Sequence, residues 1–126
     1  MKPAKKLSIG LIIIGSSVIL LVLVLVRTKL ILRIWDDLVL DSKQHYLPCD
    51  KLPSMAKAWQ VVEEHQDVMQ KIEQVHPGLI GVGVDEICPG KADIVIWYGS
   101  HLDRVKIEKI INNETFFGIP YRLQNR

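Results

Sequence analysis

The longest hydrophobic pattern in the chain is an uninterrupted apolar run over residues 7–26. It holds 20 residues without a charge, and 15 of them are Leu, Ile or Val. A helix of that length rises about 30 Å, which is the thickness of the hydrocarbon core of a bilayer. Lipid requires that backbone polar groups be satisfied within the segment, so the run predicts one transmembrane helix.

A cleaved signal peptide is the alternative for this run. The basic tail over residues 1–6, with Lys2, Lys5 and Lys6, is typical of one. The run is longer than a usual signal core, however, and no small-x-small cleavage site precedes Arg27. We therefore expect a retained single-pass anchor. A short tail before a signal anchor usually stays in the cytoplasm, so we expect the following domain to be extracytoplasmic.

The next segment, residues 27–41, carries apolar residues at helical spacing. Arg33, Asp36 and Asp37 fall on other faces of that helix. The segment therefore predicts a short amphipathic helix. Two hypotheses stay open: the apolar residues lie in the lipid interface, or they pack on the domain or on a partner protein. We call these residues the membrane-proximal stripe: Leu30, Ile31, Ile34, Trp35 and Leu38.

Residues 42–53 are polar and interrupted by prolines, which indicates a linker before a domain over residues 54–126. Ser54 is expected to cap a helix that continues to about residue 76, with apolar residues on one face. A capping pattern at Ser100 and Asp103 predicts a second helix to about residue 111.

Alternating patterns predict three strands, at residues 79–86, 93–98 and 117–124. The order α-β-β-α-β indicates an α+β fold close to a ferredoxin-like split. Pro120 has no N–H for a ladder, which favours an edge position for the last strand. Tyr121 and Leu123 are therefore candidates, together with the membrane-proximal stripe, for binding a partner.

Composition limits the partners. The chain has 126 residues, 16 Lys and Arg against 14 Asp and Glu, and 48% hydrophobic residues, which fits one small domain behind an anchor. The three lysines of the tail account for the basic excess, because residues 27–126 hold 13 basic and 14 acidic side chains. Nucleic acid is therefore an unexpected partner. We expect membrane lipid and a membrane-associated protein instead.

Cys49 and Cys88 are the two cysteines, and their spacing fits neither a C-x-x-C motif nor a paired zinc site. In an oxidising compartment they would form a disulfide, whereas in the cytoplasm two free thiols are expected. The triplet that begins at Asn113 matches the N-x-T glycosylation acceptor, but such triplets arise often by chance, and an asparagine that ends a helix is the favoured explanation.

Gly81 and Gly83 share one strand face, which favours close approach of a helix, or alternatively a groove for a ligand or partner near Trp97. No motif indicates a nucleophile with its base, a metal site or a cofactor; Ser100 and His101 are adjacent but Ser100 is expected to cap a helix. We therefore expect a membrane-anchored accessory or scaffold subunit rather than an enzyme. The alternative is a tethered sensory module whose glycine-bearing face binds a ligand, although a small-molecule ligand is not indicated.

Overall fold

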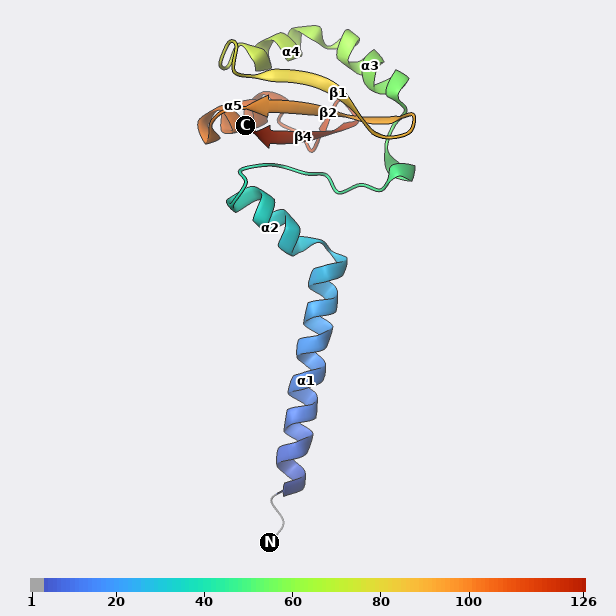
Figure 1. Ribbon diagram of the computed structural model, residues 1–126, viewed down its shortest axis with the longest axis vertical. Helices are drawn as coiled ribbons and strands as arrows, with labels where there is room; N and C mark the ends of the chain where they lie inside the picture. The colour runs from blue at the N-terminus through green and yellow to red at the C-terminus, as the bar shows by residue number, and fades with distance from the viewer. Residues whose placement is uncertain (1–3) are drawn as a thin grey trace. The chain divides into compact units, whose positions relative to one another are not determined.

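The computed structural model describes residues 4–126, with side chains from Gly10 onward (Figure 1). Much of the basic tail expected at residues 1–6 thus lies outside the described residues. The chain divides into two compact units between Ile34 and Trp35. Helix α1 (Ala4–Arg27) contains the stretch Gly10–Arg27, which is long and apolar enough to cross a membrane by length and composition. Lys29, in left-handed conformation, separates α1 from the next helix.

Helix α2 (Leu30–Leu38) occupies the predicted amphipathic segment. The predicted long helix over residues 54–76 is instead two helices, α3 (Met55–Glu64) and α4 (Gln66–Glu73). The break is at His65, whose backbone leaves the helical region at φ −122° and ψ 37°. Its imidazole stacks on Phe117, with ring centroids 3.5 Å apart, so the position at the break contacts a distant turn.

The sheet has four strands in the order β1-β2-β4-β3. Strands β1 (Gly81–Cys88) and β2 (Lys91–Tyr98) correspond to the first two predicted strands and form an antiparallel hairpin. Helix α5 (His101–Ile111) then connects β2 to β4 (Ile119–Asn125), which runs parallel to β2.

The predicted sheet is corrected in two respects. The short strand β3 (Thr115–Phe116) was not expected, and it places β4 inside the sheet rather than at its edge. A ferredoxin-like split is not confirmed, because β2 and β4 are direct neighbours, whereas a split βαβ unit has another strand between its parallel pair. The observed class is mixed α+β.

Both predicted serine caps are present. Ser54 accepts a hydrogen bond from the backbone N–H of Lys57, and Ser100 accepts one from that of Asp103. Asn112 ends α5 in left-handed conformation. Helices α3, α4 and α5 supply one side of a single core, and the sheet supplies the other. The main buried residues of β2 and β4 in this core are Ala92, Ile94, Ile96, Tyr98, Ile119, Tyr121 and Leu123.

The extended segment 41–47, which we call the strap, runs beside β4 on the side away from α3 and α4 (Figure 1). The backbone N–H and C=O of Lys43 both bond to Leu123, at 2.9 and 3.0 Å. The first half of the predicted linker is therefore bound to the domain.

Candidate interaction surface

Helix α2 has an apolar and a polar side, and the domain holds the polar one. Tyr46 donates its hydroxyl hydrogen to Asp36, and Arg104 of α5 donates to Asp37. Trp35 and Leu38, on the other side, are 57% and 76% exposed. The other residues of the membrane-proximal stripe, Leu30, Ile31 and Ile34, are exposed as well.

Arg104 fixes the chain where it leaves α2. Its side chain is only 7% exposed, and it donates to Asp37, to Asp41 at 3.0 Å and to Glu108 at 3.3 Å. Burial disfavours its charged form, but the hydrogen bonds to Asp37 and Asp41 outweigh this and raise the pKa of Arg104. The guanidinium therefore stays charged and ties the end of α2 to α5.

Asp41 is the shared acceptor of this cluster. Its carboxylate also contacts His101 Nδ1 at 2.7 Å, and its backbone oxygen accepts the hydroxyl hydrogen of buried Tyr98. Burial alone would raise the pKa of Asp41, but the hydrogen bonds from His101 and Arg104 lower it. Burial, together with the nearby charge of Asp41, raises the pKa of the Tyr98 hydroxyl, which remains a donor.

A second polar cluster holds the strap to the sheet. The carboxylate of Asp93, fully buried on β2, lies 2.8 Å from His45 Nε2 and accepts hydrogen bonds from Arg122 of β4. His45 Nδ1 accepts the backbone N–H of Leu47 at 3.1 Å, so Nε2 carries the proton that Asp93 accepts. Both ring nitrogens of His45 are thus engaged in holding the strap.

The two candidate partner-binding residues of β4 are not on a surface. Tyr121 is 2% exposed and Leu123 is fully buried, because both face the core. The backbone of Leu123 pairs with Lys43 on the side that was expected to be an open edge. The interaction surface that the sequence predicted is therefore reduced to the membrane-proximal stripe.

Cys49 and Cys88 form a disulfide, with Cα atoms 6.0 Å apart. The bond joins the short helix η1 (Cys49–Lys51), in the second half of the predicted linker, to the end of β1. Together with the strap, it leaves the segment between α2 and α3 attached at several points. Residues 42–51, which were predicted as part of a linker, are thus bound to the domain by these contacts.

The glycine-bearing face of β1 is filled from within the sheet. A Cβ on Gly81 would lie 3.0 Å from the Trp97 ring, and one on Gly83 would lie 3.2 Å from it. The indole of Trp97 thus crosses both glycines, and the guanidinium of Arg126 lies 4.5 Å from its centroid. The close approach was expected from a helix or a partner, but a neighbouring strand provides it.

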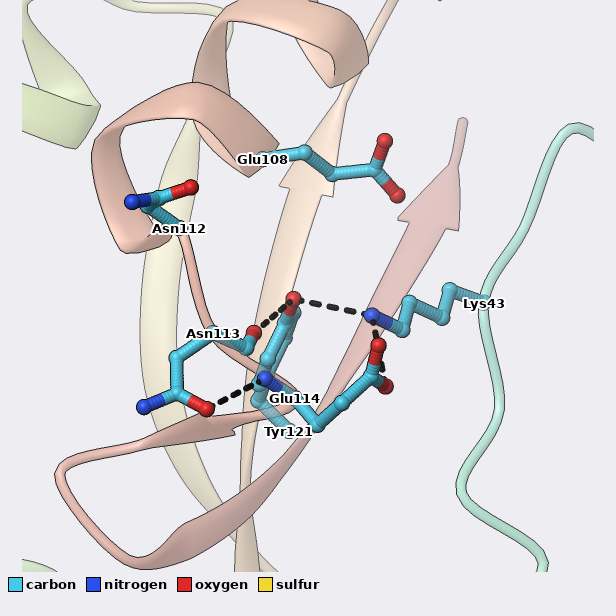
Figure 2. A pocket seen from close by; sticks show the side chains of 6 residues that line it. All are labelled: Lys43, Glu108, Asn112, Asn113, Glu114 and Tyr121. Atoms are coloured by element: carbon cyan, nitrogen blue, oxygen red, sulfur yellow. Dashed lines mark hydrogen bonds and ion pairs between the residues drawn. The ribbon is translucent and has the colours of Figure 1, made fainter.

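Asn113 borders an open polar pocket of about 510 Å³ at the end of α5 (Figure 2). Lys43 Nζ lies 3.0 Å from the Tyr121 hydroxyl and 3.4 Å from a Glu114 carboxylate oxygen. Burial lowers the pKa of Lys43, but the hydrogen bond to Tyr121 outweighs this, so the pKa is raised. The lining residues are Lys43, Glu108, Asn112, Asn113, Glu114 and Tyr121.

Ser100 and His101 do not face each other: Ser100 caps α5, while His101 contacts Asp41. Within residues 4–126, no cluster of three or more His, Cys, Asp or Glu residues is arranged to hold a metal ion. The sequence had no local signal for Arg104 or Asp93 as the centres of the two polar clusters. Apart from Glu108, which is four residues from Arg104, their partners lie 29 to 67 residues away.

Comparison of this chain with protein-family models, with curated proteins and with solved structures finds no match.

Proposed function

We propose that this protein is a single-pass membrane-anchored accessory subunit whose α+β domain docks a membrane-associated partner protein through the membrane-proximal stripe. One observation supports this most directly. The domain binds the polar side of α2 through Arg104 and Tyr46, so Trp35 and Leu38 point away from it. Because Asp36 and Asp37 are held in this way, Trp35 and Leu38 are preorganised for an external surface.

The occupant of the stripe is a protein rather than lipid. Helices that lie in a lipid interface usually carry Lys and Arg on their polar side, where these meet anionic headgroups. The polar side of α2 carries one basic residue, Arg33, against Asp36 and Asp37, and both aspartates are engaged by the domain. An exposed aromatic residue flanked by aliphatic ones is typical of the centre of a protein interface.

The domain functions outside the cytoplasm in this proposal. A disulfide between Cys49 and Cys88 persists in an oxidising compartment and is rare in the cytoplasm. The helix Gly10–Arg27 supplies the anchor. The partner is therefore a protein with an apolar surface at the outer side of the same membrane.

The test is co-purification from native membranes in a mild detergent after cross-linking. Ile34→Asp and Trp35→Asp place a charge on the stripe, and we expect both variants to lose a discrete partner that the wild-type chain retains. Trp59→Asp is the matched control, because Trp59 is 48% exposed on α3, outside the stripe. An unchanged set of co-purifying proteins in the stripe variants contradicts the proposal.

Binding of lipid to the membrane-proximal stripe would be detected by tryptophan fluorescence. In a chain with Trp59→Phe and Trp97→Phe, Trp35 is the remaining tryptophan. The fluorescence emission of Trp35 is compared between the protein in a small amphiphile and the protein reconstituted into protein-free vesicles. If the emission in the vesicles is shifted to the blue, lipid covers the stripe and the protein partner is rejected. We expect no such shift until the partner is added.

A ligand-binding module on the glycine face is the second candidate. One observation favours it: the indole nitrogen of Trp97 is buried without a hydrogen-bond acceptor among the described residues. Trp97→Phe keeps the ring over Gly81 and Gly83 but removes the donor. A ligand that binds there would lose affinity in this variant, whereas docking through the stripe would be unaffected.

A further inference from the structure

Asn113 lies in an exposed turn beside a polar pocket. Asn112 ends α5 with φ +46°, and strand β3 begins at Thr115, so Asn113 lies in the short exposed turn between them. The triplet Asn113, Glu114 and Thr115 has the N-x-T pattern of an asparagine-linked glycosylation acceptor.

The side chain of Asn113 is oriented with its nitrogen outward. Its Oδ1 accepts the backbone N–H of Glu114 at 2.7 Å, so the amide nitrogen is the free end (Figure 2). Thr115 Oγ1 accepts the N–H of Gly118 at 3.2 Å, which fixes the third residue of the triplet at the base of the β3–β4 turn.

The pocket beside Asn113 matches a neutral, hydroxyl-rich molecule. It offers donors from Lys43 and Asn112, and acceptors from Glu108 and Glu114, while the Tyr121 hydroxyl donates to the backbone oxygen of Asn113. One ammonium against two carboxylates makes it slightly negative, which disfavours an anion. A volume of about 510 Å³ is in the range of small-ligand pockets and is compatible with one or two sugar rings.

We propose that Asn113 carries an asparagine-linked glycan whose first sugar lies over this pocket. The donor class is an oligosaccharide linked to a lipid pyrophosphate. The Asn113 amide nitrogen forms a bond to the anomeric carbon, the bond from that carbon to the pyrophosphate breaks, lipid pyrophosphate leaves, and one amide proton passes to a base. This inference rests on the extracytoplasmic orientation of the proposed function.

The full chain is expressed in animal cells, and the membranes are treated with an amidase that hydrolyses the glycan–asparagine bond. We expect one discrete fall in apparent mass and conversion of Asn113 to Asp in the peptide mass spectrum. Asn113→Gln and Thr115→Ala abolish the fall. Asn112→Gly, at the adjacent asparagine outside the triplet and with its left-handed conformation preserved, keeps it, as does Thr115→Ser.

A wild-type chain that shows no mass change overturns the inference. Cysteine oxidation, measured on the same sample, distinguishes the cause: oxidised Cys49 and Cys88 leave the proposed orientation intact and reject glycosylation alone, whereas free thiols reject both.

The placement of the sugar is tested separately by the rate of amine acylation. We expect Lys43 to be acylated more slowly in the glycosylated chain than after removal of the glycan, whereas Lys57 is acylated at the same rate in both. An equal rate at Lys43 in the two states overturns the placement over the pocket.

Discussion

The guanidinium of Arg104 and the carboxylate of Asp41 lie 3.0 Å apart, although 63 residues separate them in the sequence. Arg104 belongs to α5 and Asp41 to the strap, three residues after α2 ends. The same guanidinium also binds Asp37 within α2. This pair therefore fixes Asp37 and the start of the strap against α5.

Replacing Arg104 is expected to destabilise the domain and release the end of α2. Arg104→Met removes the guanidinium from Asp37 and Asp41, and Asp41 keeps His101. The cost is about 2 kcal/mol, less than for a fully buried pair because Asp37 is 57% exposed. Urea unfolding of the full chain in detergent measures it. Lys106→Met, an exposed position on the same helix, is the control and changes the unfolding free energy by less than about 0.5 kcal/mol.

Acid is expected to weaken the same cluster. The unfolded Asp41 carboxyl has a pKa of 3.8, and in the folded protein its pKa is lower. The stabilisation that ionised Asp41 gives is therefore complete above its pKa in the unfolded chain. It is lost as the pH falls through its lower pKa in the folded protein, because between these two pKa values the unfolded chain binds more protons than the folded one.

Asp41→Asn tests this dependence. The free energy of unfolding of the wild-type chain should fall more steeply below about pH 4 than that of the variant. The hydrogen bonds to Ser100 and His76 lower the pKa of Asp103, so the unfolding free energy of the Asp41→Asn variant still falls at low pH, with a smaller slope of the same sign. Equal slopes in the two proteins would show that Asp41 does not contribute.

The disulfide is expected to be the largest single contribution to stability. Linking residues 39 positions apart restricts the unfolded chain by about 4 kcal/mol in the loop-entropy description. Replacing both Cys49 and Cys88 with Ser should lower the unfolding free energy by roughly that amount. Reductant should then lower the stability of the wild-type chain and leave the double variant unchanged. A reductant effect of equal size in both would exclude the bond as its cause.

A larger side chain at Gly81 of β1 is expected to destabilise the domain, because the Trp97 ring occupies the space above this residue. Gly81→Val places atoms against the indole, at a cost of about 1–3 kcal/mol. Trp97→Leu in the same chain should recover part of this loss, so a double-mutant cycle measures the coupling. Gly99→Ala is the control, since a Cβ there meets nothing within 4 Å and no positive φ is required. Additive effects of Gly81→Val and Trp97→Leu would contradict the contact.

Sequence patterns predicted the features that depend on near neighbours along the chain. A few adjacent residues were enough to predict the caps at Ser54 and Ser100, the two strands on either side of the turn before Lys91, and the helical end at Asn112.

Contacts between distant residues were not predictable in this way. The short strand β3 depends on a turn in which both Phe117 and Gly118 have positive φ, and Phe117 has little intrinsic preference for that conformation. Tyr121 and Leu123, which Pro120 had indicated as residues of an edge strand, are buried in a strand that pairs with β2 on one side and with β3 on the other. The strap resembled a polar linker because its partners, Arg104 and Asp93, are far away in the sequence.

The most direct test of the account is the accessibility of Cys49 and Cys88 to a membrane-impermeant thiol reagent in intact cells that carry the full chain. An anchored, extracytoplasmic domain predicts no labelling before reduction and labelling of both cysteines from outside after a mild impermeant reductant. Labelling that occurs without reductant, and only once the membrane is permeabilised, would place the domain in the cytoplasm with free thiols. That result would contradict the orientation, the disulfide and the docking of a partner at the outer surface.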